Sequence, residues 1–226
     1  QFAWQTSWGV SWRLIGAMIM VHGDDKGLVL PPKVAPMQVV IIPIYKSDEA
    51  RETVFPKVNE IKEQLESKKI RVHVDDRNDL TPGYKFNDWE LKGVPLRIEI
   101  GPKDIEKQQI VLAKRYNREK ISLGFDEIEK IVTILDEIQM DMLKIARAKA
   151  KENTINISDY AEFKSKIGKG GFFNADWCGK TECEEKIKEE TGADIRVIPF
   201  GSENTNGKCI YCKEQNIATP IFARGY

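Results

Sequence analysis

Residues 75–104 read DDRNDLTPGYKFNDWELKGVPLRIEIGPKD, and this stretch decides which kind of domain the chain holds. An acidic turn and a Thr-Pro-Gly-Tyr break lead into a short predicted helix over residues 84–91. An apolar strand is predicted to follow over residues 96–100. Readers of single-stranded RNA need such a mixture, because unpaired bases stack on aromatic rings while charged side chains hydrogen-bond their edges.

Glu90 and Arg97 carry the sharper prediction within this stretch. A glutamate can accept hydrogen bonds from N1 and N2 of guanine, and an arginine can donate two hydrogen bonds to its O6 and N7. A Glu90–Arg97 salt bridge would use the same two side chains, so both interpretations stay open. We further expect at least one of the nearby aromatic side chains to be buried, and Arg97 and Glu99 to lie on opposite faces of the strand.

The surrounding sequence, from residue 38 to about residue 152, alternates predicted strands and helices. Residues 39–44 are continuously apolar and β-branched, as expected for a parallel strand buried on both faces. Ser47 can cap a helix that runs to Lys68, with apolar residues at helical spacing. The further predicted elements are strands over 70–74, 110–113 and 121–123, and an amphipathic helix over about 126–151. This pattern predicts a small α/β unit with a mixed sheet.

The segment before this unit holds an apolar run over residues 15–21, which fits a helix or strand buried on most sides. Arg13 stands directly before the run, where an unpaired charge is costly, so it needs an anion. A carboxylate and a phosphate both suit its planar guanidinium. We interpret His22 as a partly buried histidine rather than a catalytic base. The proline-rich residues 30–36, LPPKVAP, suit a stiff linker.

The composition of the chain limits the classes of function that it can have. Of 226 residues, 41% are hydrophobic and 31% charged, which is typical of a globular protein. The 35 basic and 35 acidic residues balance, which argues against a non-specific nucleic-acid coat but leaves room for a local reader. Residues 103–120 are locally basic. No apolar run reaches membrane-spanning length and no secretory signal opens the chain. Because the first residue is not Met, we expect a piece of a longer protein.

All four cysteines fall in the last part of the chain. They form two close pairs, Cys178 with Cys183 and Cys209 with Cys212. This spacing is typical of a structural zinc site with four thiolates, which stabilises a small domain and leaves no open position for catalysis. Two disulfides are the alternative, as is a redox role for the second pair. The piece between the pairs, residues 182–198, has helix and then strand character.

Together these residues resemble prolyl-tRNA synthetase of the archaeal and eukaryotic type, over essentially the whole chain. The resemblance rests on QTSWGVSWRLIGAMIMVHGDDKGLVLPPKVAP, on residues 75–104 and on the cysteine pairs with the ending IFARGY. It implies an α/β fold of three parts. Residues 1–32 would end a class II catalytic domain with its antiparallel sheet, residues 37–152 would form a mixed-sheet α/β anticodon-binding domain, and residues 153–226 a small α+β zinc-binding domain.

The resemblance also implies roles for individual residues. Arg13 would hold the ATP phosphates as the catalytic arginine of motif 3, and Tyr226 would approach the active site. The ATP and prolyl-adenylate pocket would include Trp8, Gly9, Ser11 and Arg13, while Trp12 departs from the hydroxyl residue common in the family. The guanines of the proline anticodon would be read by Phe86, Glu90, Arg97 and Lys103. Zinc would be held by Cys178, Cys183, Cys209 and Cys212.

The implied activity is that of a proline–tRNA ligase, which forms prolyl-adenylate from proline and ATP with Mg²⁺ and transfers proline to tRNA(Pro). The parent would be a cytoplasmic homodimer without membrane contact. Motifs 1 and 2 would precede residue 1, so residues 1–226 alone are not expected to activate proline. The alternatives are a non-catalytic RNA-binding module, a synthetase for threonine, glycine or histidine, and a zinc-stabilised interaction domain. The zinc segment and the KFNDWELKG sequence speak against the second.

Overall fold

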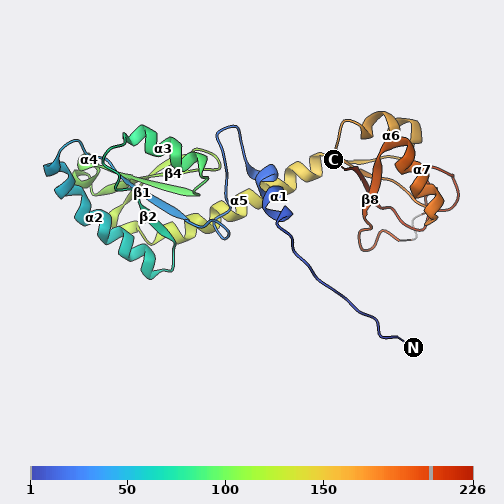
Figure 1. The fold of residues 1–226 in the computed structure, drawn as a ribbon, viewed down its shortest axis with the longest axis horizontal. Coiled ribbons are helices and arrows are strands. Elements are labelled where there is room, and N and C mark those ends of the chain that lie inside the picture. Colours follow the sequence, from blue (N-terminus) through green and yellow to red (C-terminus); the bar gives the residue numbers. More distant parts are fainter. Residues whose placement is uncertain (1, 204–205, 226) are drawn as a thin grey trace. The chain divides into compact units, whose positions relative to one another are not determined.

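The computed structural model describes residues 2–203 and 206–225, in two compact units, Gln1–Ala146 and Arg147–Tyr226. Each unit has its own sheet and its own core (Figure 1). Within the described ranges, no helix combines the length and the apolar character that crossing a bilayer requires.

The first unit is built on a five-stranded sheet in the order β2-β1-β3-β4-β5. β1 pairs in parallel with both β2 and β3, whereas β3–β4 and β4–β5 are antiparallel. The strands are β1 Val39–Pro43, β2 Val72–Val74, β3 Leu96–Ile100, β4 Gln109–Lys114 and β5 Lys120–Gly124. The predicted mixed sheet is therefore confirmed, and every residue of β1 is buried as its apolar sequence requires.

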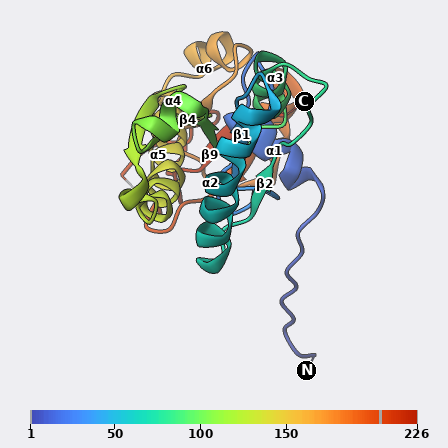
Figure 2. The same ribbon diagram turned by 90° about the vertical axis from the view of Figure 1, so that its left-hand side faces the viewer.

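Helices pack on both faces of this sheet (Figure 2). α2 (Asp48–Ser67) and α5 (Lys130–Glu152) share one core with alternate residues of β1, while α3 (Pro82–Leu91) packs on the other face. The predicted cap of α2 is present, because the Ser47 hydroxyl accepts a hydrogen bond from the Ala50 N–H at 3.3 Å. The remaining elements of this unit are α1 (Arg13–His22), α4 (Pro102–Glu106) and a short 3₁₀ helix, Phe125–Glu127.

The α3 side of the sheet carries the charged residues of β3. Val40 stands opposite Arg97 in the ladder and Ile42 opposite Glu99, so both charged side chains share the face that α3 covers over β1. The expectation that Arg97 and Glu99 lie on opposite faces was wrong. They are two residues apart, and side chains two apart in a strand point to the same side.

The segment before β1 differs from the expectation in two ways. The apolar run forms α1, but none of its residues is fully buried, and Met20 is 63% exposed. Residues 2–12 form no strand, so the expected antiparallel sheet stays a prediction.

The proline-rich residues 30–36 are not a free linker. Ala35 is buried, and the Arg71 guanidinium donates to the carbonyls of Ala35 and Pro32, both at 3.0 Å.

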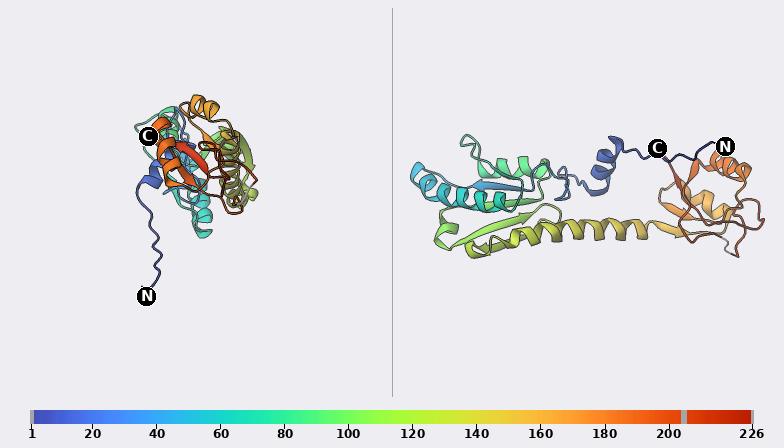
Figure 3. Two further views of the ribbon diagram at one scale, coloured as in Figure 1. Left: turned by 90° about the vertical axis from the view of Figure 1, so that its right-hand side faces the viewer. Right: turned by 90° about the horizontal axis from the view of Figure 1, so that it is seen from below.

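The second unit has a four-stranded sheet in the order β6-β7-β9-β8 (Figure 3, orange to red). β6 pairs in parallel with β7, and the other pairs are antiparallel. The elements are β6 Thr154–Asn156, α6 Tyr160–Ile167, β7 Phe172–Asn174, α7 Thr181–Thr191, β8 Ala193–Val197 and β9 Ile221–Arg224. Three fully buried rings, Phe163, Phe173 and Phe222, form the centre of its core. α7 followed by β8 confirms the predicted helix and strand between the cysteine pairs.

Candidate functional site

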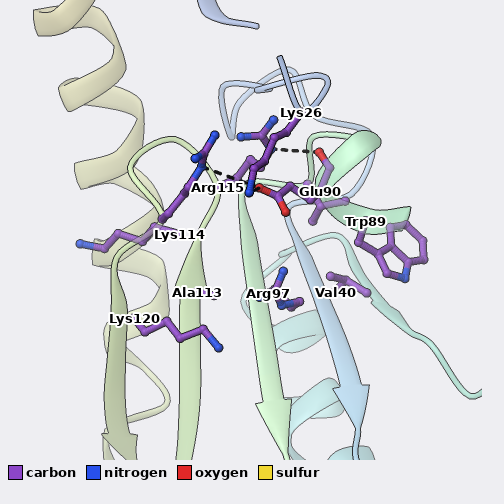
Figure 4. Close-up of a pocket in the computed structure, with 11 residues that line it drawn as sticks. Lys26, Val40, Trp89, Glu90, Arg97, Ala113, Lys114, Arg115 and Lys120 are labelled. Atoms are coloured by element: carbon purple, nitrogen blue, oxygen red, sulfur yellow. Dashed lines mark hydrogen bonds and ion pairs between the residues drawn. The ribbon is translucent and has the colours of Figure 1, made fainter. Parts of the chain in front are cut away.

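A hollow of about 160 Å³ opens on the α3 side of the first sheet, above the β1, β3 and β4 strands (Figure 4). Its lining includes one carboxylate, that of Glu90, against a larger set of cationic side chains. These cations are Lys26, Arg97, Lys114, Arg115, Arg118 and Lys120. Salt bridges to Glu90, Glu99, Glu119 and Asp24 balance part of this charge, and the positive surplus that remains favours an anionic ligand. Part of the basic stretch noted in the sequence therefore converges on one site.

Arg97 is held between an aromatic ring and a carboxylate in this hollow. Its guanidinium carbon lies 4.3 Å from the centre of the Phe86 ring, and its Nε and Nη2 donate to Glu99 Oε1 at 3.0 and 2.8 Å. Lys120 donates to the other Glu99 oxygen at 2.9 Å. Arg97 therefore pairs with Glu99, and the predicted alternative, a salt bridge between Glu90 and Arg97, is not found in the described part of the chain.

The Glu90 carboxylate is mostly buried yet carries no short contact. Its side chain is 17% exposed, and the nearest cationic atoms are Lys26 Nζ and Arg118 Nε, both at 3.8 Å. Both distances exceed the length of a hydrogen bond, and no residue within 2–203 or 206–225 donates a hydrogen bond to this carboxylate. Glu90 thus keeps its acceptor capacity for a ligand.

α3 is fixed to the sheet by the fully buried carboxylate of Asp75. It accepts hydrogen bonds from Trp89 Nε1 at 2.7 Å and from the Arg77 guanidinium at 2.7 and 2.9 Å, and Lys85 Nζ lies 3.8 Å away. Burial alone raises the pKa of Asp75, but these hydrogen bonds and the Lys85 charge outweigh it and hold the pKa well below its usual range. Trp89, 5% exposed, is the buried aromatic that the sequence predicted.

The structure brings Phe86, Glu90 and Arg97 together and places the fourth predicted RNA contact elsewhere. Lys103 lines a second hollow of about 470 Å³, where β1 and β3 end, together with Ile44. Sequence reasoning missed Lys26 at the first hollow. Nothing in its local sequence marks it, because a tertiary contact brings it there.

The predicted residues of the ATP pocket lie in the exposed segment at the start of the chain. Trp8 is 95% exposed, and Gly9, Ser11 and Arg13 are exposed as well. The Ser11 hydroxyl accepts a hydrogen bond from the Arg13 backbone N–H at 3.4 Å. Within the described ranges these residues form no enclosed pocket, so their roles stay predictions. Tyr226 lies outside the described residues.

His22, which ends α1, is partly buried, in keeping with the interpretation from sequence. This burial lowers the pKa of His22, because desolvation disfavours the charged imidazolium. The side chain is therefore mainly neutral at neutral pH.

The four cysteines of the second unit converge although the two pairs are far apart in sequence. They are free, and their sulfur atoms all lie within 4.8 Å of one another. Cys178 Sγ lies 3.6 Å from both Cys183 Sγ and Cys212 Sγ. A tetrahedral zinc with bonds of about 2.3 Å places its sulfur ligands about 3.8 Å apart, so these residues fit a four-thiolate zinc site and not two disulfides.

The protonation of these thiols depends on their surroundings. Burial raises the pKa of Cys178 and of Cys183. Burial acts in the same direction on Cys209, but hydrogen bonds from the backbone of Cys212 and Tyr211 outweigh it and lower that pKa. A bound metal would favour the thiolate form of all its ligands.

Comparison with known proteins connects both units to one family. Residues 38–134 match the anticodon binding domain model, and residues 160–226 match the model of the prolyl-tRNA synthetase C-terminal domain. A curated relative from Cenarchaeum symbiosum, named proline–tRNA ligase, is 51% identical over 226 residues, which is 100% of this chain and 47% of the relative. The chain belongs to the prolyl-tRNA synthetase family.

Two further relatives agree with this assignment. The proline–tRNA ligase of Acetoanaerobium sticklandii is 51% identical over 228 residues, covering 100% of this chain and 47% of its own length. The crystal structure of prolyl-tRNA synthetase from Cryptosporidium parvum, complexed with L-proline and AMP, matches with a TM-score of 0.87 and 40% identity, over 95% of this chain and 46% of that one. The chain thus spans about half the length of the curated relatives that it matches.

Proposed function

We propose that this chain is the tRNA-reading and zinc-binding portion of a proline–tRNA ligase. The observation that carries the proposal is the hollow in which Phe86, Glu90 and Arg97 meet within a matched anticodon binding domain. The whole synthetase, a cytoplasmic homodimer in this proposal, would act on proline, ATP and tRNA(Pro).

In the hollow, the proposed ligand is a guanine of the anticodon. Glu90 accepts hydrogen bonds from N1–H and N2–H of the base, because its carboxylate carries no hydrogen bond of its own. The Arg97 guanidinium donates to the base acceptors from a position fixed by Phe86 and Glu99. The surrounding cations bind the phosphates, which adds affinity without sequence information. We propose Lys103, at the second hollow, as a contact to a neighbouring nucleotide.

The synthetic reaction has two steps. A proline carboxylate oxygen attacks the α-phosphorus of ATP, which forms prolyl-adenylate and releases pyrophosphate. The terminal ribose hydroxyl of the tRNA then attacks the prolyl carbonyl, which forms the ester and releases AMP. The exposed Arg13 is proposed to bind the ATP phosphates and to neutralise their charge, beside a pocket formed in part by Trp8, Gly9 and Ser11. Mg²⁺ would supply further neutralisation, and Tyr226 would approach this site.

The second unit is proposed to bind one Zn²⁺ through its four cysteines, which the sulfur distances support. The metal stabilises the fold and takes no part in the reaction, since four thiolates leave no open coordination position. We propose domain limits of 1–32, 37–152 and 153–226.

Binding of anticodon stem–loop RNA to residues 1–226 tests this proposal. A stem–loop with the GG of proline anticodons should bind more tightly than one with AA at two salt concentrations, although both affinities fall as salt rises. Equal binding of the two RNAs would leave only non-specific attraction and would contradict the proposal. Selective RNA binding by a whole protein that forms no prolyl-adenylate would instead favour the non-catalytic RNA-binding module.

A further inference from the structure

The turn that follows α1 is joined to the end of α3 by its backbone. Leu28 N–H donates to the Leu91 carbonyl at 3.0 Å, and Leu30 N–H donates to the Gly93 carbonyl at 3.2 Å. The two segments cross so closely that a Cβ on Gly27 would stand 2.6 Å from the Leu91 carbonyl oxygen. Residues 24–30 therefore hold a fixed position beside the helix that carries Glu90.

Asp24, the first residue of this turn after Gly23, accepts the hydrogen bonds of the neighbouring cations. Arg115 donates from Nη2 and Nη1 to its two oxygens at 2.6 and 2.8 Å, and Arg118 Nη2 donates at 3.1 Å. The Lys26 backbone N–H adds a fourth hydrogen bond at 2.9 Å. The hydrogen bond from Arg115, more than any other cause, holds the pKa of Asp24 well below its usual range.

Arg118 stands between two carboxylates and is bound to only one of them. Its Nη2 lies 3.1 Å from Asp24 Oδ2, while its Nε lies 3.8 Å from Glu90 Oε1. The Arg118 side chain is 53% exposed, so it can turn toward Glu90 if Asp24 no longer attracts it. A guanidinium–carboxylate hydrogen bond is roughly twice as strong as a neutral one. Such a pair would occupy the oxygens that a guanine needs.

We propose that Asp24 is a specificity-determining positioning residue, which holds Arg118 and Arg115 so that the Glu90 carboxylate stays free for the N1 and N2 hydrogens of guanine. Asp24 itself contacts no base. The inference rests on the proposed function, since it concerns the same hollow. It adds a residue outside the matched anticodon binding domain, which begins at residue 38.

The test compares Asp24→Asn with the unmodified 226-residue chain, using stem–loop RNAs that carry GG or AA. The unmodified chain should prefer GG by about fivefold to a hundredfold. Asp24→Asn should bind both RNAs about equally, because Arg118 then pairs with Glu90. Its affinity for the AA RNA at low salt should not fall, since the substitution removes a negative charge. Asp25→Asn is the matched control: it removes the same charge from an exposed neighbour and should keep the preference.

The double variant Asp24→Asn/Arg118→Gln separates positioning from folding. Because the double variant lacks the competing guanidinium, its preference for GG should return. If Asp24→Asn had instead disturbed the structure of the turn, removing Arg118 would not restore the preference. A selective Asp24→Asn chain, or a double variant as unselective as the single one, would overturn the inference. If Asp24→Asn does not fold, Arg118→Gln alone decides: retained preference supports the role of competitor, and lost preference overturns it. A wild-type chain without preference would instead overturn the proposed function itself.

Discussion

The Arg97 guanidinium carbon lies 4.3 Å from the centre of the Phe86 ring, so the arginine of β3 and the aromatic residue of α3 form one cation–π pair. In addition, Glu99 accepts two hydrogen bonds from the same guanidinium. Arg97 is thereby oriented before any ligand arrives, and little side-chain entropy remains to be lost on binding.

Replacing Arg97 tests its proposed contact with guanine. Arg97→Ala should weaken binding of the GG stem–loop by about 1–3 kcal/mol and reduce the preference over AA, because the donors to O6 and N7 are lost. Fluorescence anisotropy titrations with both RNAs measure this effect. Lys107→Ala, which removes an exposed charge not found in the hollow, should lower both affinities only slightly. An Arg97→Ala chain with unchanged preference would contradict the assignment.

The buried carboxylate of Asp75 should make the first unit sensitive to acid. Its pKa is lower in the folded chain than the ordinary value of about 3.9. The stabilisation is therefore complete above about pH 5 and is lost as the pH falls from there toward the folded pKa. Urea unfolding of the unit at several pH values should show this loss.

Asp75→Asn should remove much of that acid dependence and lower the free energy of unfolding by about 3–5 kcal/mol at pH 7, because Lys85 is left buried without its counter-charge. Asp76→Asn changes the exposed neighbour and serves as the control. Equal unfolding curves for the two variants would show that the Asp75 network contributes little.

Two glycines at the ends of α3 should respond in opposite ways to alanine. Gly93 has φ +71°, and a Cβ there would stand 2.5 Å from the Leu28 carbonyl oxygen. Gly93→Ala should therefore cost at least about 1–2 kcal/mol from backbone strain alone. Gly83 has no atom within 4 Å of the same position, so Gly83→Ala should be neutral or stabilise by up to about 1 kcal/mol. Thermal unfolding of both variants measures the difference, and equal shifts would contradict the close crossing.

Metal removal should act on the second unit alone. The purified chain should contain one zinc ion, and Cys209→Ser or a strong chelator should remove it, because the remaining thiolates no longer enclose the metal. Amide hydrogen exchange should then rise in residues 147–226 while the first sheet stays protected, which serves as an internal control. A wild-type chain free of zinc, with a well-protected second unit, would contradict the proposed site.

Local sequence was sufficient for much of the fold. Residues 39–44 predicted β1, Ser47 predicted the start of α2, and the pattern between the cysteine pairs predicted α7 and β8. These elements depend on short-range signals, namely apolar periodicity and capping. The faces of β3 were equally available from sequence, because the two-residue period of a strand places Arg97 and Glu99 together.

Long-range pairings were not available in this way. Asp24 and Arg115 are 91 residues apart, and no local pattern marks them as partners. The burial of α1 was also predicted wrongly, since an apolar run shows what a helix can pack against but not whether a partner is present. Convergence of Phe86, Glu90 and Arg97 could be predicted because one short loop joins α3, which carries the first two, to β3, which carries the third. Lys103 follows β3 and lies at its far end.

The backbone crossing at Gly27 and Gly93 decides where the first unit of this chain can be cut. A shortened chain that starts at residue 37 leaves the carbonyls of Leu91 and Gly93 without their donors. It also leaves Arg115, whose side chain is 4% exposed, without its carboxylate partner. An autonomous module therefore has to begin upstream of Asp24. The proline-rich residues 30–36, which resemble a domain linker in sequence, lie inside this folding unit.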